Sequence, residues 1–528
     1  MRNISARVCP MADDSAKLQR SPREVARWQQ AQQQLLGERH DAALTSYHGL
    51  TQKFPGVSQL WFELGIAAAG ELDFPLAQKA FARTQQLAPN DATMLVLLGQ
   101  QYHRLRQMDL ARACFEKAVA ADPSSLQARL SLAAWYERER RLDDAMECIE
   151  ACAARHAHDP QVASLRAMLL HRKGRSGEAE TILRELAARP LKDHAVRSGI
   201  CHLLATVLDE SGRYLEALRW LLEGKQAASQ TANVGKMTQD YDRADKRRRD
   251  LLASFKPTTI QRWRQEAVEP APSQPAFLGG HPRSGTTLLE QILGVHPQIL
   301  AFDEPEAFAH EIWNRLAPMQ AAKNLTITEL DSLPAPKRKT LRERYLKSLL
   351  REVDGSPGTR VLLDKNPSPT ASLHLWLRVF PELKIIIALR DPRDVVVSCF
   401  FQNLQLTPTN ANFLSLERTV KHYSDLMDVW LRMRELGGFD WVETRYEDLV
   451  AHLETESRRV TGFLGLDWHP NQARHQEAAG RKILFSPTYS DVTKPIHNRA
   501  VGRWRNYEEA LGPLQERLAP YCLAFGYM

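Results

Sequence analysis

The sequence predicts two fold classes in one chain, an all-α solenoid in the N-terminal half and an α/β domain with a mainly parallel central sheet in the C-terminal half. Two observations support this prediction. Small and bulky apolar residues recur every 34 residues through the first half, which is typical of a helical repeat. In the second half, short apolar runs end in glycine, basic or hydroxyl residues and lead into helical segments, as strands of a parallel sheet do.

The repeat is marked by an alanine and by a bulky residue four places later. The alanines are Ala43, Ala77, Ala111, Ala145 and Ala179, and the bulky residues are Tyr47, Phe81, Phe115, Ile149 and Leu183. Positions four apart lie on one face of a helix, so the alanine lets a neighbouring helix approach while the bulky residue fills the groove. Pro55, Pro89 and Pro123 keep the same period and end each unit, because proline cannot continue a helix.

This pattern resembles the tetratricopeptide repeat over residues 27–229, with a looser sixth unit at Ala217 and Leu221. The resemblance implies an α-solenoid whose concave face binds a protein partner. A plain helical bundle without repeat geometry is the alternative. Taken alone, the repeats would indicate only an interaction scaffold.

These patterns divide the chain into four parts. Residues 1–26 form an N-terminal tail, and the repeats occupy residues 27–229. Residues 230–270 are expected to form a charged helix followed by a proline-rich boundary. Residues 271–528 then form the α/β domain.

The most informative segment of the α/β domain is residues 275–293. A short apolar strand runs into Arg283-Ser284-Gly285-Thr286-Thr287 and then into an amphipathic helix. This order directs several backbone N–H groups and the positive end of a helix at one point, which suits a phosphate or a sulfate. Arg283 adds a bidentate cation, and the three hydroxyl residues add donors. No lysine follows the glycine, so the nucleoside-triphosphate loop G-x-x-x-x-G-K-[ST] is not matched.

A second segment indicates the same chemistry. Residues 383–389 read as a strand buried on both faces, Arg390 follows at once, and Ser398 lies on the next expected helix. With Arg283 107 residues upstream of Arg390, the two segments resemble the 5′-phosphosulfate loop and the 3′-phosphate motif of sulfotransferases. The resemblance implies 3′-phosphoadenosine 5′-phosphosulfate as donor and adenosine 3′,5′-bisphosphate as product. Arg390 and Ser398 would then bind the 3′-phosphate.

Within that superfamily, residues 275–510 are most similar to the tyrosylprotein sulfotransferases. The acidic pair Asp303-Glu304 is in register with an acidic pair of that family, in which the second acid is the general base, so the resemblance assigns this role to Glu304. A strand-like run from Val361 ends at Lys365, which is similar to the family's lysine that faces the transferring sulfonyl group. A solvated loop acid is the alternative interpretation of the acidic pair.

Three further residues are implied by the same resemblance. Tyr446 lies in a Tyr-Glu-x-Leu element and would lie near the adenine of the donor. Thr488 would contribute a hydroxyl near the sulfate, and Arg503 would be a second ligand of the 3′-phosphate. An ordinary solvated basic loop is the alternative interpretation of this C-terminal segment.

These residues together suggest how sulfuryl transfer would proceed. Transfer is an in-line displacement in which negative charge spreads to the departing phosphate. We expect Glu304 to take the proton from an acceptor hydroxyl, and Lys365 and Arg283 to stabilise the charge that develops. No cluster of metal ligands is visible in the sequence, so we expect no metal.

Three functions remain open at this stage. The first is sulfation of a tyrosine in a protein or peptide that the repeats recruit, and the second is sulfation of a carbohydrate, lipid or small molecule. The third is a repeat scaffold that binds nucleotide without catalysis. The tyrosylprotein sulfotransferases have an arginine two residues after the base, whereas this chain has Glu306, which would repel acidic peptides. Their known acceptor preference is therefore not transferred.

Composition indicates the cellular compartment and the classes of partner to expect. The seven cysteines are odd in number, scattered and without C-x-x-C pairs, which argues against a disulfide framework or a zinc site and favours a cytoplasmic location. The chain shows no signal-peptide core and no run of 18 apolar residues, so we expect no membrane span. The net charge of +7 lies mostly in mixed-sign helices, and no motif supports binding to nucleic acid.

Overall fold

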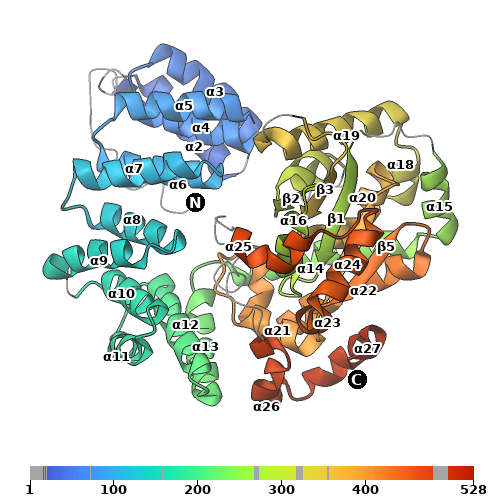
Figure 1. Ribbon diagram of the computed structural model, residues 1–528. Coiled ribbons are helices and arrows are strands. Elements are labelled where there is room, and N and C mark those ends of the chain that lie inside the picture. Colours follow the sequence, from blue (N-terminus) through green and yellow to red (C-terminus); the bar gives the residue numbers. More distant parts are fainter. Residues whose placement is uncertain are drawn as a thin grey trace. The chain divides into compact units, whose positions relative to one another are not determined.

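The computed structural model of the chain divides into two compact units, Met1–Ala188 and Arg189–Met528 (Figure 1). It describes residues 16, 18–19, 21–37, 39–71, 73–156, 158–266, 273–316, 325–353, 356–479 and 498–527. The expected boundaries at 26, 229 and 270 stay predictions, because the compact units follow packing and not the repeat pattern.

The first unit is a series of antiparallel helix pairs. The pairs are α2 (Pro22–Leu36) with α3 (His40–Lys53), α4 (Ser58–Gly70) with α5 (Phe74–Leu87), α6 (Ala92–Arg104) with α7 (Met108–Ala121), α8 (Leu126–Arg138) with α9 (Leu142–His156), and α10 (Pro160–Arg172) with α11 (Ser176–Ala187). Each periodic alanine lies on the second helix of its pair and is fully buried. This confirms the helical repeat that the sequence predicts.

Close helix approach explains the repeat positions. A Cβ added to Gly65 on α4 would lie 2.4 Å from the ring of Phe81 on α5. The next pair repeats the arrangement, with 2.6 Å between a Cβ at Gly99 and the ring of Phe115. The bulky residue of the second helix therefore packs directly against a glycine of the first. Such packing stabilises each pair through close contact of the two backbones.

The second unit is built on a five-stranded sheet. Its strands are β1 (Gln274–Gly280), β2 (Ile299–Asp303), β3 (Val361–Lys365), β4 (Lys384–Leu389) and β5 (Trp441–Arg445), in the order β2-β3-β1-β4-β5. All four pairings are parallel, which confirms the predicted parallel sheet. Strand β2 is not among the strands expected above, although Ile299-Leu300-Ala301-Phe302 is an apolar run of the right length.

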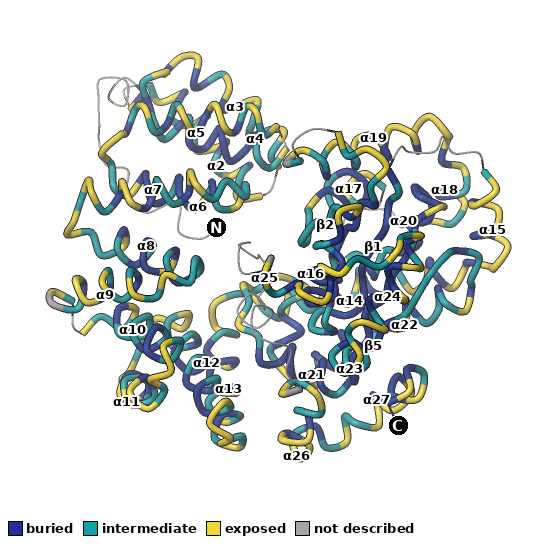
Figure 2. The backbone as a smooth tube through the Cα atoms, in the orientation of Figure 1, coloured by how far each residue is buried: buried dark blue, intermediate teal, exposed yellow. Residues whose placement is uncertain are grey.

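Helices cover both faces of the sheet. The unit contains α12 (His194–Glu210), α13 (Tyr214–Ser229), α14 (Val234–Ala253), α15 (Pro257–Gln265), α16 (Thr286–Gly294), α17 (Asn314–Leu316), α18 (Ile327–Asp331), α19 (Ala335–Leu349), α20 (Leu373–Val379), α21 (Pro392–Phe400), α22 (Leu416–Leu436), α23 (Tyr446–Ala451), α24 (Leu453–Phe463), α25 (His475–Ala479), α26 (Glu508–Leu511) and α27 (Leu514–Phe525). Alternate strand residues enter two separate apolar clusters, one with α16 and α24 and the other with α20 and α22. The central strands are therefore dark blue in Figure 2, as a parallel sheet requires.

Candidate active site

The candidate site lies at the carboxyl edge of the sheet, where three neighbouring strands end. Leu278 of β1 is paired with Lys365 of β3, and Lys365 is paired with Asp303 of β2. The loop that follows β1 and the acidic pair at the end of β2 are therefore brought to opposite sides of Lys365. In open α/β sheets, ligands bind at this carboxyl edge.

The loop between β1 and α16 has an unusual backbone. Gly285 has a φ of 89°, and a Cβ there would lie 2.6 Å from the ring of Tyr446, so this position has no room for a side chain. Arg283 has a φ of 74°, a region that a residue with a Cβ rarely occupies. Helix α16 begins at Thr286, so the N–H groups of its first turn point at the loop. This arrangement can bind an anion.

Two arginines and a serine meet beside this loop. Arg283 Nε donates to Ser398 Oγ at 3.0 Å, and Arg390 Nη1 donates to the carbonyl oxygen of Arg283 at 3.2 Å. Arg390 comes directly after β4, and Ser398 lies in the last turn of α21. The structure therefore brings together residues that stand 107 and 115 positions apart in the chain.

Arg390 is poised for an anionic partner. Its side chain is 7% exposed, and its Nε is buried without a hydrogen-bond partner. Its guanidinium lies 5.2 Å from the centroid of the Tyr446 ring. The nearest carboxylate, Asp394 Oδ2, is 3.8 Å from Nη2 and also accepts from the backbone N–H of Gly502. A buried guanidinium with an unused donor fits a phosphate group.

Lys365 is held by the two acids at the end of β2, Asp303 and Glu304. Its side chain is 0% exposed, and Nζ forms ion pairs with Asp303 Oδ1 and, at 3.1 Å, with Glu304 Oε1. Burial by itself would lower the pKa of Lys365. The negative charges of Glu304 and Asp303 outweigh burial, so the pKa of Lys365 is raised above its ordinary value. Lys365 is therefore a charged cation at neutral pH, at the end of a central strand.

Glu304 occupies a strained position that faces solvent. Its φ is 48°, and its backbone N–H donates to the carbonyl oxygen of Lys365 at 2.7 Å. Its side chain is 40% exposed, compared with 11% for that of Asp303. Glu306 also faces solvent and pairs with His310 at 3.2 Å. Of the acidic pair, Glu304 is thus the one that an acceptor could reach.

Of the three remaining expected residues, the structure describes Tyr446 and Arg503. The ring of Tyr446, at the start of α23, lies against Gly285 and Arg390. Arg503 lies close to the end of α21, where Asp209 accepts its Nη2 hydrogen bond at 2.8 Å. Thr488 lies outside the described residues. The roles of all these residues in binding and catalysis stay predictions.

Sequence reasoning missed a buried histidine pair behind the loop. His281 Nδ1 donates to the carbonyl oxygen of Pro282 at 2.8 Å, which leaves its Nε2 to accept from His422 Nδ1 at 2.9 Å. Burial lowers the pKa of His281 to about 4 and that of His422 well below its ordinary value, so both rings are neutral. His281 lies within the loop segment 275–293, but its partner on α22 leaves no local signal.

Comparison with known proteins agrees with the motifs. A family model described as "Sulfotransferase family" matches residues 275–470, and two described as "Tetratricopeptide repeat" match residues 68–126 and 102–169. Protein-tyrosine sulfotransferase A of Caenorhabditis elegans is 25% identical over 270 residues, which are 48% of this chain and 66% of that protein. Protein-tyrosine sulfotransferase 2 of Gallus gallus is 25% identical over 235 residues, 43% of this chain and 62% of that protein. The chain thus spans less than two thirds of the length of each of these relatives.

Similarity of this chain to solved structures is low. The type IV pilus biogenesis factor PilW superimposes with a TM-score of 0.31 at 17% identity, covering 38% of this chain and 91% of that chain.

Within the described ranges, no helix is both long and apolar enough to cross a membrane. The same ranges contain no group of three or more His, Cys, Asp or Glu side chains arranged to hold a metal. Whether a metal takes part stays a prediction.

Proposed function

We propose that this chain, whose residues 275–470 form a sulfotransferase-family domain that follows tetratricopeptide repeats, transfers a sulfuryl group from 3′-phosphoadenosine 5′-phosphosulfate to an acceptor hydroxyl. The acceptor we favour is a tyrosine of a protein or peptide. One observation carries the proposal. The loop suited to an anion and the pair of Lys365 with the Glu304 carboxylate lie at adjacent strand ends. A phosphosulfate donor held by the loop and a base at Glu304 would therefore both be close to one acceptor hydroxyl.

The donor-binding residues fall into two groups. The loop Arg283-Ser284-Gly285-Thr286-Thr287 would hold the 5′-phosphosulfate with backbone N–H groups and with the hydroxyls of three residues that are less than 7% exposed. Arg390 and Ser398 would hold the 3′-phosphate, and the unused Nε of Arg390 supports that fit. Tyr446 would contact the adenine. Thr488 and Arg503 would complete the set.

The chain's own residues then perform three tasks. The donor supplies the sulfuryl group and its phosphate leaving group. Lys365 and Arg283 neutralise negative charge as it develops, and the buried position of Lys365 strengthens that interaction because little water screens it. Glu304 accepts the proton of the acceptor hydroxyl, and its exposed carboxylate is open to an incoming substrate. Its contact with Lys365 orients the carboxylate.

Glu304→Gln tests the assignment of the base. We expect the variant to bind adenosine 3′,5′-bisphosphate like the wild type but to lose about 10²-fold or more in turnover, the usual scale for removing a general base. Labelled donor and tyrosine peptides provide the turnover assay, and calorimetry provides the affinity. Glu306→Gln is the matched control, because it removes a nearby exposed acid that contacts His310. Equal turnover of the Glu304 variant and the wild type would exclude Glu304 as the base.

The acceptor class is the least constrained part of the proposal. Glu306 is exposed two residues after Glu304, and the pair presents negative charge to any acceptor. A neutral or basic peptide, a carbohydrate, a lipid or another small molecule is therefore a second candidate class. Labelled donor incubated with cell extract separates these possibilities by showing whether label appears on protein, on glycan or on small molecules. A chain that binds donor product but labels nothing would instead be a nucleotide-binding scaffold.

The repeats and the location complete the proposal. We propose that the concave face of the repeats binds a protein partner, either the acceptor itself or an assembly factor. A cytoplasmic location is our proposal as well, and it rests on the odd number and scatter of the cysteines. Neither the donor chemistry nor the base assignment depends on these two points.

A further inference from the structure

The last helix pair of the repeat pattern, α12–α13, is packed into the core of the unit that holds the sheet. Ala205 of α12 and Leu221 of α13 are buried in the same apolar cluster as Ile385 of strand β4. Tyr214 at the start of α13 stacks edge-on against Tyr507, with 5.8 Å between ring centroids. This hairpin therefore belongs structurally to the sulfotransferase domain, although its alanine follows the repeat pattern.

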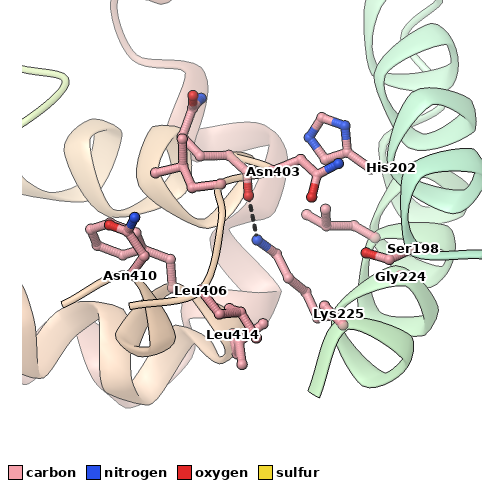
Figure 3. Close-up of a pocket in the computed structure, with 13 residues that line it drawn as sticks. Ser198, His202, Gly224, Lys225, Asn403, Leu406, Asn410 and Leu414 are labelled. Atoms are coloured by element: carbon pink, nitrogen blue, oxygen red, sulfur yellow. Dashed lines mark hydrogen bonds between the residues drawn. The ribbon is translucent and has the colours of Figure 1, made fainter. Parts of the chain in front are cut away.

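The hairpin satisfies the carboxyl end of α21. The last carbonyl groups of a helix need donors from outside the helix. Phe401 O accepts from His202 Nε2 at 2.7 Å, and Gln402 O accepts from Lys225 Nζ at 2.6 Å. Figure 3 shows His202 and Lys225 on the hairpin, with Lys225 reaching the segment that follows α21. The cavity left there holds about 20 Å³, room for about one water.

Lys225 adds a favourable charge at this helix end. Lys225 is 8% exposed, and burial lowers the pKa of its amino group to about 8. It therefore still carries a positive charge at neutral pH, which interacts favourably with the negative end of a helix. Its Nζ also lies 5.3 Å from the centroid of the Phe400 ring.

Asp209, near the end of α12, holds a second segment. Its carboxylate accepts from Arg503 Nη2 at 2.8 Å and from the hydroxyl of Tyr507. The guanidinium of Arg503 lies 4.5 Å from the centroid of the Phe401 ring. Asp209 therefore ties the segment Arg503–Tyr507 to α12, and Arg503 contacts the carboxyl end of α21 through Phe401.

These two elements carry the groups that we assign to the 3′-phosphate. Arg390 precedes α21, Ser398 lies in its last turn, and Arg503 opens the second segment. The segment is also fixed from the other side, because Asp394 on α21 accepts from the backbone N–H of Gly502 at 2.7 Å. The hairpin thus contacts both elements that carry these groups, at the carboxyl end of α21 and at the segment Arg503–Tyr507.

We propose that the α12–α13 hairpin is part of the donor site and that Asp209 is a positioning residue that holds Arg503 for the 3′-phosphate. The inference rests on the proposed function. An arginine side chain has many rotamers, and holding it in one of them before binding removes part of the entropy cost of binding. Asp209 is 14% exposed and Arg503 21%, so the pair is partly shielded from water. Asp209 acts through Arg503 and touches no reacting atom.

Calorimetry with two nucleotides tests this role in the full chain. Adenosine 3′,5′-bisphosphate carries the 3′-phosphate and adenosine 5′-monophosphate lacks it. We expect Asp209→Asn to weaken binding of the bisphosphate by about fivefold to tenfold, the scale of one typical hydrogen bond. Binding of the monophosphate should stay within about twofold of the wild type, because only the 3′-phosphate uses Arg503.

Three further variants separate positioning from general stability. Asp209→Glu keeps the charge and should recover most of the lost affinity. Asp209→Asn combined with Arg503→Gln should bind no worse than Arg503→Gln alone, because one residue acts through the other. Asp193→Ala is the matched control: Asp193 caps the other end of α12 through Ala195 N at 2.8 Å, so its loss destabilises the same helix without touching Arg503.

The outcomes distinguish the inference from the function on which it rests. A wild-type chain that does not bind the bisphosphate would remove the proposed function and the inference with it. A wild type that binds it, with an Asp209→Asn variant that binds both nucleotides unchanged or loses both equally, would overturn the inference alone. Additive losses in the double variant would do the same. If Asp209→Asn does not fold, the Asp209→Glu and Arg503→Gln variants carry the comparison.

Discussion

Acid should destabilise the second unit through its buried histidines. Burial lowers the pKa of His281 to about 4 and that of His374 to about 3, whereas an unfolded chain has a histidine pKa of about 6.5. Because the folded pKa lies below the unfolded one, the unfolded state takes up protons first as the pH falls. Stability is therefore full above pH of about 6.5 and decreases toward pH of about 4, where the folded rings also protonate.

The size of the effect follows from those shifts. Lowering the pH from about 7.5 to about 5.5 favours the unfolded state by about 1.3 kcal/mol for each ring. His281 and His374 together therefore cost about 2.6 kcal/mol, a large part of a typical stability of about 5–15 kcal/mol. His422, which faces His281, adds to the loss. Asp394 and Asp245 oppose it, because burial raises the pKa of both carboxyl groups.

Urea titrations at the two pH values measure how the free energy of unfolding depends on pH. Comparing His374→Leu with the wild type gives the contribution of the His374 ring alone, because the carboxyl groups contribute equally in both. The variant should lose about 1.3 kcal/mol less than the wild type between pH 7.5 and pH 5.5. His194→Gln, which changes an exposed residue at the start of α12, should leave the wild-type dependence unchanged. The reasoning is refuted if His374→Leu shows the full wild-type loss.

Changes at three glycines and at Arg283 give further predictions. Gly285→Ala should lower the affinity for adenosine 3′,5′-bisphosphate by about tenfold or more in calorimetry, because its Cβ would lie 2.6 Å from the tyrosine ring beside it at a φ of 89°. Gly65→Ala should cost about 1–3 kcal/mol in urea titrations, because its Cβ would lie 2.4 Å from the Phe81 ring. Gly177→Ala, with nothing within 4 Å, should instead stabilise the chain or leave it unchanged. Because Arg283 has a φ of 74°, the Arg283→Gly variant should be more stable than Arg283→Ala by about 1 kcal/mol in urea titrations. Both variants should lose affinity for adenosine 3′,5′-bisphosphate. Equal stability of the two variants would mean that the backbone at Arg283 is not strained.

The sequence predicts local features of this chain better than long-range ones. The periodic alanines and the loop after β1 lie in continuous segments whose chemistry is set by neighbours, so the pattern is enough to identify them. Ala217 and Leu221 follow the same pattern, yet their hairpin packs with the sheet. Periodicity reports which face of a helix is buried and not what buries it.

Pairings between distant residues were the part that the sequence could not predict. Asp209 and Arg503 are 294 positions apart, and His281 and His422 are 141 apart. Neither pair has a motif, because its geometry depends on how whole helices pack. The split of roles within Asp303-Glu304 followed from the family resemblance and not from the residues themselves. The structure adds a physical basis for it, since the strand ends at Asp303 and leaves Glu304 in the turn beyond.

The turn at Glu304 and the turn at Arg283 share a feature that bears on the function of both. Each side chain is needed at a point where the backbone has positive φ, 48° and 74°, so glycine cannot replace it without losing the charged group. Such positions cost about 1–3 kcal/mol and persist only when neighbouring contacts enforce them. Those contacts are present: Glu304 N donates to Lys365 O at 2.7 Å, and Arg283 O accepts from Arg390 at 3.2 Å. One of these bonds comes from the backbone of Lys365, which we assign to catalysis, and the other from the side chain of Arg390, which we assign to the 3′-phosphate, so both strained turns are held by residues of the proposed site.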